Sequence, residues 1–170
     1  MVDVDVGGFA AALPYLRRQT ARALDARVMT GEWLTPELEL GCASGCWLHR
    51  AAGTVPRPVV FELHGGGFAL GDARKGDALR AWVRDTFDVN VVGIEYRLAP
   101  EHPFPAALND VVGTVRRIVT GGEVEVAPAH AVLMGYSAGA NLAVAYALLS
   151  QRDDSAPLVS GLALHYPCLD

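Results

Sequence analysis

Cysteines, charged side chains and long apolar runs are all scarce in this chain of 170 residues. The three cysteines fit neither a disulfide framework nor a common zinc site, because their number is odd and only three residues separate the first two. We therefore expect no metal site, and we interpret the cysteines as small apolar side chains in a reducing compartment. They are Cys42, Cys46 and Cys168.

The charge pattern argues against two further classes of protein. Charged residues make up 19% of the chain, the net charge is -5 and no Lys/Arg-rich run is present, so we expect no nucleic-acid partner. Gly, Pro or charge interrupts every apolar run before about 18 residues, so we predict no membrane span. Residues 1–5 carry acid where a signal peptide would carry basic residues, which favours a cytoplasmic protein.

Predicted strands and helices alternate along the chain. Apolar residues make up 51% of the composition, which suits a sheet buried on both faces, and the length allows one domain. The order of elements favours an α/β architecture, a mostly parallel sheet with helices on both faces. The patterns predict a hairpin over 37–50, strands over 59–63, 90–96, 131–136 and 158–165, and helices over 8–28, 74–87, 105–119 and 138–150.

Two short motifs carry the chemistry. The glycine-rich run HGGGF at 64–68 directly follows the predicted strand 59–63, where its backbone N–H groups can face a ligand. The run GYSAG at 135–139 has the G-x-S-x-G pattern of a nucleophile elbow. Together the motifs predict acyl transfer from an ester, with Ser137 as the nucleophile.

A serine at the tip of a sharp strand-to-helix turn needs small neighbours. Gly135 and Gly139 leave room for the turn and for the helix over 138–150 to pack against the strand. The turn places the Ser137 hydroxyl at the helix N-terminus, where the Ala138 N–H and the helix dipole favour a negative oxygen. The G-x-S-x-G pattern alone is a weak signal, but the strand before it and the Ala-rich helix after it supply the expected context.

Each motif has a purely structural or competing interpretation. The run at 135–139 could be a tight strand–helix turn that happens to carry serine, and its context disfavours that interpretation. The run at 64–68 could be a phosphate-binding loop. That alternative fails because no Lys-Ser/Thr follows the glycines and no G-x-G-x-x-G pattern opens a helix.

The longer motifs resemble the hormone-sensitive-lipase family of α/β-hydrolases, which contains many bacterial carboxylesterases. The resemblance covers roughly residues 36–170, which would form the N-terminal portion of the catalytic domain of an incomplete α/β-hydrolase fold. Residues 1–35 would correspond to the family's N-terminal cap helices. The matching runs stand in the family's order and spacing: HGGGF at 64–68, YRLAPEHPFPAAL at 96–108, GYSAGANLA at 135–143 and Tyr166-Pro167.

The resemblance implies a serine esterase that needs no cofactor. Ser137 would be the nucleophile, and the N–H groups of Gly66, Gly67 and Ala138 would form the oxyanion hole. The family uses the histidine at the position of His64 to support the glycine loop. The implied substrates are small esters with short or medium acyl chains.

The chain departs from the family pattern in two places. Tyr136 stands before the nucleophile, where the family usually has Asp. The family's catalytic Asp and His lie on later strands that this chain does not contain, so the strand over 158–165 would be a sheet edge, through which we expect homo-oligomers. None of the candidates after Ser137 sits in a family triad motif; they are Asp153, Asp154, His165 and Asp170.

Four further polar side chains need an interpretation. We expect His102 to brace the Pro-rich loop, and His49 and His130 to lie at the surface. His165 ends a strand and is a candidate replacement base, although a packed or solvated side chain is the more common role there. Glu62 interrupts an apolar strand, which suggests a buried hydrogen-bond partner.

Three functional hypotheses stay open at this point. The first is a serine carboxylesterase whose base and acid come from elsewhere, so that these 170 residues alone are weak or inactive. The second is a non-catalytic small-molecule binder, since plant gibberellin receptors resemble the family without complete triad chemistry. The third is a degraded remnant. Intact nucleophile and oxyanion motifs favour the first, because a receptor need not keep them.

Overall fold

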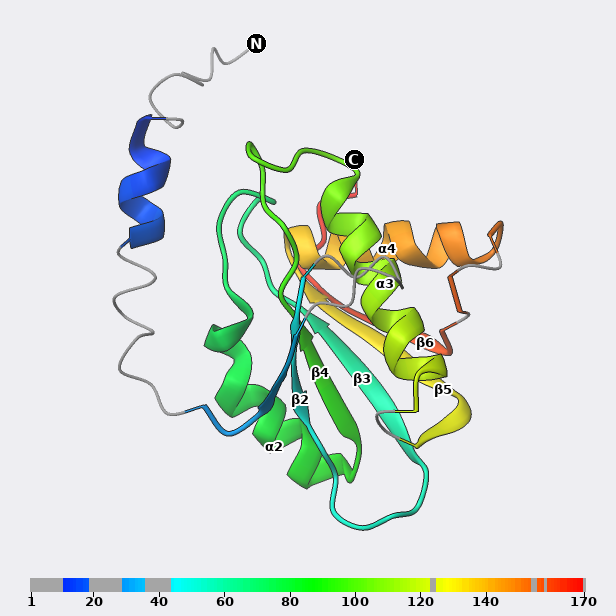
Figure 1. Ribbon diagram of the computed structural model, residues 1–170. Coiled ribbons are helices and arrows are strands. Elements are labelled where there is room, and N and C mark those ends of the chain that lie inside the picture. The colour runs from blue at the N-terminus through cyan, green and yellow to red at the C-terminus, as the bar shows by residue number, and fades with distance from the viewer. Residues whose placement is uncertain are drawn as a thin grey trace.

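A computed structural model describes residues 11–18, 29–35, 44–122, 125–153, 156–157 and 159–169. Its strands form one sheet in the order β1-β2-β4-β3-β5-β6 (Figure 1). The four strands β4, β3, β5 and β6 run parallel, and β2 and β1 extend the sheet antiparallel beyond β4. The strands are β1 (Glu32–Leu34), β2 (Cys46–His49), β3 (Arg57–Leu63), β4 (Asn90–Ile94), β5 (Val126–Tyr136) and β6 (Gly161–His165).

Helices cover both faces of this sheet, as the sequence predicts. α2 packs against β2 and β4, whereas α3 and α4 pack against each other and against β5. A further helix spans residues 11–18 and lies beside this core. The other described helices are the 3-10 turn η2 (Ala73–Gly76), α2 (Asp77–Phe87), α3 (Ala106–Thr120) and α4 (Ala138–Ser150).

The alternation of side chains along β3 divides the core into two layers. Val59, Phe61 and Leu63 are fully buried in the larger cluster, which α3 and α4 complete. Val60 points the other way and packs with Val83 of α2. Because side chains alternate with a period of two, Glu62 shares the face of Val60 and therefore meets α2.

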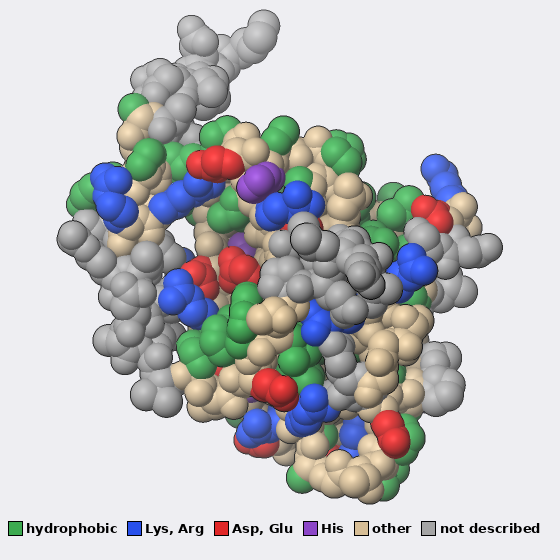
Figure 2. All heavy atoms as spheres, in the orientation of Figure 1, with side chains coloured by type: hydrophobic (Ala, Val, Ile, Leu, Met, Phe, Trp, Pro, Cys, Tyr) green, Lys and Arg blue, Asp and Glu red, His purple; other side chains and the backbone are tan. Residues whose placement is uncertain are grey.

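The face of the molecule drawn in Figure 2 is mixed in charge. Acidic and basic side chains lie interspersed over the face drawn in Figure 2, with small apolar areas between them. No helix among the described residues is long and apolar enough to cross a membrane.

Several predicted boundaries differ from the observed ones. The sequence predicts a hairpin within 37–50, but the strand that pairs with β2 in this way is β1, which ends before Pro36. The prediction is therefore wrong for the first strand of the hairpin. Residues 36–43 lie outside the described part. β5 begins earlier than predicted because Val126 pairs with Arg57 before a register shift. Of the predicted helix over 8–28, the described portion is 11–18.

Glu62 has the buried partner that its position in an apolar strand suggests. The Arg80 guanidinium of α2 donates to Glu62 Oε2 over 2.8 Å and to the Ala73 carbonyl over 2.7 Å. Neither side chain is more than 4% exposed. A Cβ at Gly93 would lie 2.6 Å from Arg80 Cζ, and one at Gly76 would meet the same guanidinium, so both glycines make room for the ion pair.

We expect Arg80→Met to lower the free energy of unfolding by about 3–5 kcal/mol, because it leaves the Glu62 carboxylate buried without a partner. Replacing both Glu62 and Arg80 with Met should cost much less, since neither member of the pair is then left buried without the other. Urea unfolding measures both. Arg84→Met on the same helix is the control, because Arg84 pairs with an exposed Asp85 and such pairs contribute about 0–1 kcal/mol. Equal losses for Arg80→Met and Arg84→Met would contradict the expectation.

Candidate functional site

The two sequence motifs leave the sheet side by side. β3 and β5 are parallel neighbours, and the register that pairs Leu63 with Gly135 brings their carboxyl ends to the same edge. A Cβ at Gly65 would lie 2.9 Å from the Tyr136 carbonyl and 3.5 Å from Ser137 Cβ. The glycine loop therefore lies directly against the serine turn, at the sheet edge where open α/β folds bind ligands.

Ser137 occupies a strained backbone conformation between β5 and α4. Its φ is 51° and its ψ is -115°, a region that non-glycine residues rarely adopt. Its N–H donates to the His165 carbonyl over 3.0 Å, and its carbonyl accepts from Asn141 N over 3.1 Å. These bonds fix the turn, with Ala138 as the first residue of α4.

Only glycine fits on either side of this turn. A Cβ on Gly135 would run into the Gly139 carbonyl, and a Cβ on Gly139 would run into the carbonyls of Leu63 and His64. Direct backbone contact, both within the turn and between the turn and the glycine loop, thus explains why the residues here must be small.

The glycine loop has three successive residues with positive φ. Gly66, Gly67 and Phe68 have φ values of 136°, 59° and 60°. The Gly66 carbonyl accepts from Ala69 N over 3.2 Å and from Leu70 N over 2.8 Å, which closes a tight turn. Within the described residues, no hydrogen bond uses the N–H of Gly66 or of Gly67, so both donors are available to a ligand.

His64 lies beneath this loop as a buried, neutral ring. It stacks on Tyr96 with 4.1 Å between ring centroids, and the Tyr96 hydroxyl donates to the His64 carbonyl over 2.6 Å. His64 Nδ1 lies 3.0 Å from the Gly65 carbonyl, and a bond there requires the proton on Nδ1. Burial lowers the pKa of His64 to about 4.

Among the residues that the structure describes, no histidine or carboxylate is hydrogen-bonded to the Ser137 hydroxyl. His165 ends β6 and stacks on Tyr136, with 4.7 Å between ring centroids. Within the described residues, no hydrogen bond joins Ser137 Oγ to an imidazole or a carboxylate. Asp153 follows the end of α4, while Asp154 and Asp170 lie outside the described residues.

Two cavities adjoin the glycine loop. One of about 350 Å³ is mainly apolar and is lined in part by Gly67 and Phe68 of the loop. The other, of about 470 Å³, is bounded by Arg17, Leu70, Asp72 and Glu101. His102 is exposed and borders both. The apolar cavity is formed largely by Phe68, Ala99, Phe104, Ala107, Leu108 and Leu142.

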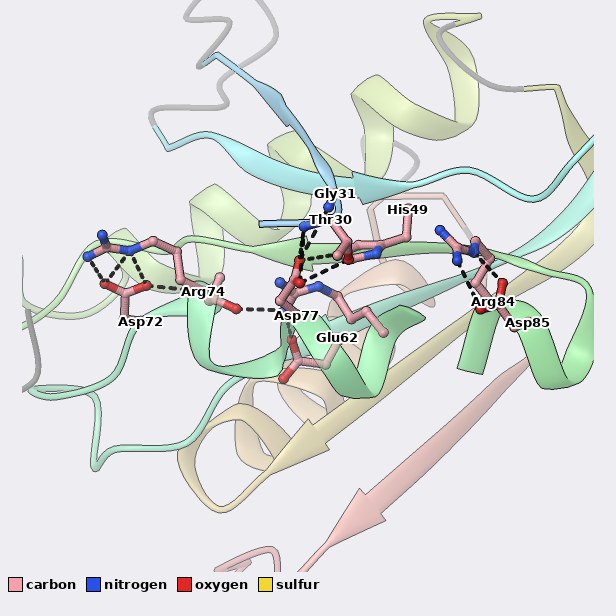
Figure 3. Close-up of polar contacts among 11 residues, drawn as sticks. Thr30, Gly31, His49, Glu62, Asp72, Arg74, Asp77, Arg84 and Asp85 are labelled. Carbon is pink, nitrogen blue, oxygen red and sulfur yellow. Dashed lines mark hydrogen bonds and ion pairs between the residues drawn. The ribbon is translucent and has the colours of Figure 1, made fainter. Parts of the chain in front are cut away.

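The sequence did not predict a polar cluster between β2 and the start of α2 (Figure 3). His49, expected at the surface, is buried and its Nε2 lies 3.1 Å from Asp77 Oδ1. Burial and the nearby Arg80 charge lower its pKa to about 4. Asp77 also accepts from the N–H and hydroxyl of Thr30 and from Gly31 N. The cluster ties the segment before β1 to the start of α2, which no local pattern around His49 could indicate.

The remaining histidine and cysteine positions named from the sequence differ in their exposure. His130 is exposed, as the sequence predicts. Among the described residues, no three His, Cys, Asp or Glu side chains converge as metal ligands. Cys46 is buried in the core and Cys168 is exposed, while Cys42 lies outside the described part.

Comparisons with known proteins identify relatives of this fold. A family model described as alpha/beta hydrolase fold matches residues 60–170. An esterase of Acinetobacter venetianus is 35% identical over 113 residues, which are 66% of this chain and 36% of that protein. The chain therefore spans little more than a third of this curated relative.

Solved structures give the same result. A bacterial heroin esterase matches with a TM-score of 0.78 and 29% identity, over 94% of this chain and 53% of its own. An esterase from the bacterial hormone-sensitive lipase family matches with a TM-score of 0.71 and 29% identity, over 91% and 50%. This chain thus corresponds to about half of each solved structure.

The buried ring of His64 should make stability depend on pH. Its pKa in the folded state is about 4, below the ordinary value of 6.5, so the unfolded chain binds the proton first. The stabilisation is complete above pH 6.5 and should fall by about 2 kcal/mol between pH 6.5 and 5. Urea unfolding across this range should show a shallower pH dependence for His64→Phe than for wild type. The exposed His130→Phe is the control, and parallel curves for wild type and His64→Phe would refute the assignment.

Proposed function

This chain belongs to the hormone-sensitive-lipase family of α/β hydrolases, and from that premise we propose that it carries the nucleophile and the oxyanion hole of a serine carboxylesterase. The observation that carries the proposal is the contact between the Ser137 turn and the Gly65–Gly67 loop. The serine turn and a loop with unused backbone donors lie together at the carboxyl ends of the parallel strands, an arrangement that suits acyl transfer.

In the proposed reaction, Ser137 Oγ attacks the ester carbonyl and gives up its proton to a general base. The carbonyl oxygen becomes an oxyanion, to which the N–H groups of Gly66, Gly67 and Ala138 donate. The intermediate collapses to an acyl-enzyme as the alcohol leaves with the proton that the base returns. Water then gives a proton to the base and attacks the acyl carbon, and the second intermediate collapses to the acid as Ser137 Oγ regains a proton.

We assign His64 to support of the glycine loop rather than to proton transfer. Its Nδ1–H is directed to the Gly65 carbonyl, its ring stacks on Tyr96, and burial holds its pKa at about 4. A base that works near neutral pH needs a pKa close to that pH.

The base and acid partner are proposed to lie outside these 170 residues. His165, the one histidine after Ser137, is occupied in stacking on Tyr136. The 170-residue chain alone should therefore be a weak or inactive esterase. The alternative function, a non-catalytic small-molecule binder, draws on the same absence of a histidine at Ser137 among the described residues.

We propose small esters with short or medium acyl chains as substrates. The cavity that includes Gly67 holds about 350 Å³, and its walls are mainly apolar side chains such as Phe104 and Leu142. Such a space suits a short hydrocarbon chain next to the oxyanion donors.

Wild type, Ser137→Ala and His165→Ala should be compared on one short-chain nitrophenyl ester. Loss of triad function typically costs on the order of 10⁴–10⁶ in kcat, so we expect wild type barely above background and little further loss in His165→Ala. A serine-directed phosphonate should label wild type slowly and Ser137→Ala not at all. Brisk turnover by wild type with two inactive variants would show that His165 is a recruited base. Absence of labelling in wild type would favour the non-catalytic binder.

We also propose self-association through β6. Among the described strands, β6 is one of the two outer ones; Leu162 within it is 39% exposed, and Tyr166 directly after it is 73% exposed. An open strand edge with apolar side chains invites pairing with a second chain. Sedimentation should show dimers or larger species, which Leu162→Lys should reduce. A compact monomer for the unmodified chain would overturn the proposal.

A further inference from the structure

One arginine from the N-terminal helix reaches the glycine loop. Arg17 lies in the helix over 11–18, where Leu13 is buried at 4% exposure and holds that helix to the protein. Arg17 Nε and Nη2 donate to the Ala69 carbonyl over 3.1 and 2.9 Å. Nη2 also donates to the Ala99 carbonyl over 2.7 Å, and Nη1 to Glu101 Oε1 over 2.7 Å. One planar group thus joins three segments that are far apart in the sequence.

Two of those segments are already linked to each other through the glycine loop. Ala99 N donates to the Phe68 carbonyl over 2.8 Å, and Ala69 N donates to the Gly66 carbonyl. Ala69 and Ala99 are therefore each held on both sides, by the loop through their N–H groups and by Arg17 through their carbonyls.

This loop needs such external bonds. Phe68 has a φ of 60°, which costs a non-glycine residue roughly 1–2 kcal/mol, and two glycines with positive φ precede it. Glycines also leave the unfolded or opened loop with more conformations than other residues would. The conformation of the loop around Gly66 and Gly67 is therefore not fixed by local preference.

We propose that Arg17 is a positioning residue that holds the glycine loop in its donor-ready conformation from the N-terminal helix. The inference rests on the proposed function, in which the loop supplies the oxyanion hole. Docking of the N-terminal helix and formation of the oxyanion hole then become one linked event, because the same guanidinium serves both.

The fork of the guanidinium matters more here than its charge. The Glu101 side chain is 55% exposed, so its ion pair with Arg17 is weak. The two carbonyls, by contrast, are bound by the Nε and Nη2 edge of a rigid planar group: Ala69 accepts from both nitrogens and Ala99 accepts from Nη2. Lysine has one ammonium nitrogen and cannot meet Ala69, Ala99 and Glu101 with the same geometry.

Amide hydrogen exchange on the whole 170-residue chain tests the hold on the loop. Arg17→Met should speed exchange at Ala69, Leu70 and Ala99 by about tenfold or more, the factor expected for lost bonds to a charged donor. The amides of β3 and β4 should keep their protection. Arg18→Met is the matched control, since Arg18 is the exposed neighbour on the same helix. Exchange in Arg17→Met equal to that in Arg18→Met would overturn the proposal.

Two further variants separate fork from charge. Glu101→Gln should leave exchange at Ala69 and Ala99 near the wild-type rate, because the carbonyl bonds remain. Arg17→Lys should recover only part of the protection that Arg17→Met loses. Full recovery by lysine would show that charge alone acts, and would overturn the assignment to the fork.

Labelling of Ser137 by a fluorophosphonate connects the loop to the chemistry. We expect Arg17→Met to label about tenfold more slowly than Arg18→Met, with Ser137→Ala as the blank. Faster exchange without slower labelling would overturn the role of Arg17 in forming the oxyanion hole. Wild-type labelling no faster than the blank would instead overturn the nucleophile assignment, and the exchange rates would still decide whether Arg17 holds the loop.

Discussion

The close approach of two backbone turns at the ends of β3 and β5 is the constraint on which the rest of the site depends. Parallel pairing in the observed register sends both chains out at one edge, and the contact then leaves no space for a side chain. A Cβ on Gly139 would meet the carbonyls of Leu63 and His64, and one on Gly65 would meet Tyr136. The glycines are thus a packing requirement between two turns, as much as a source of flexibility within each.

Hydrogen bonds hold the segment after the glycine loop on the side of the sheet that α2 covers. Glu95, which follows β4, accepts from Ala73 N over 2.7 Å, and burial raises its pKa to about 7. Arg80 reaches the Ala73 carbonyl while pairing with Glu62. The N–H and the carbonyl of Ala73 are therefore each bound by an ionisable side chain, the half-buried Glu95 and the fully buried Arg80. These bonds anchor η2 and α2, so the loop has one end in β3 and the other in a fixed helix start.

The sequence could predict what depends on local pattern and short motifs. The parallel sheet, the helix after Ser137 and the buried partner of Glu62 all follow from periodicity or from an odd residue within an apolar strand. His49 could not be placed, because its burial depends on Asp77 and on the segment at Thr30, which no local pattern connects. The contacts of Arg17 with Ala69, Ala99 and Glu101 could not be predicted for the same reason. The spacing of apolar residues in an amphipathic helix is the same whether an arginine between them faces solvent or a carbonyl.

The proposed chemistry divides between backbone and side chains in a way that the fold explains. In the proposed reaction, oxyanion stabilisation would use backbone N–H groups next to two strained turns, at Phe68 and Ser137, both with positive φ. Such turns persist only where surrounding contacts over-determine them, and here those contacts come from β3, β5, Tyr96 and Arg17. Proton transfer needs instead a mobile imidazole at a suitable pKa, which buried, stacked histidines such as His64 cannot offer. A site can therefore be preorganised for charge while its proton-transfer partner comes from a separate element, since the two tasks place opposite demands on burial.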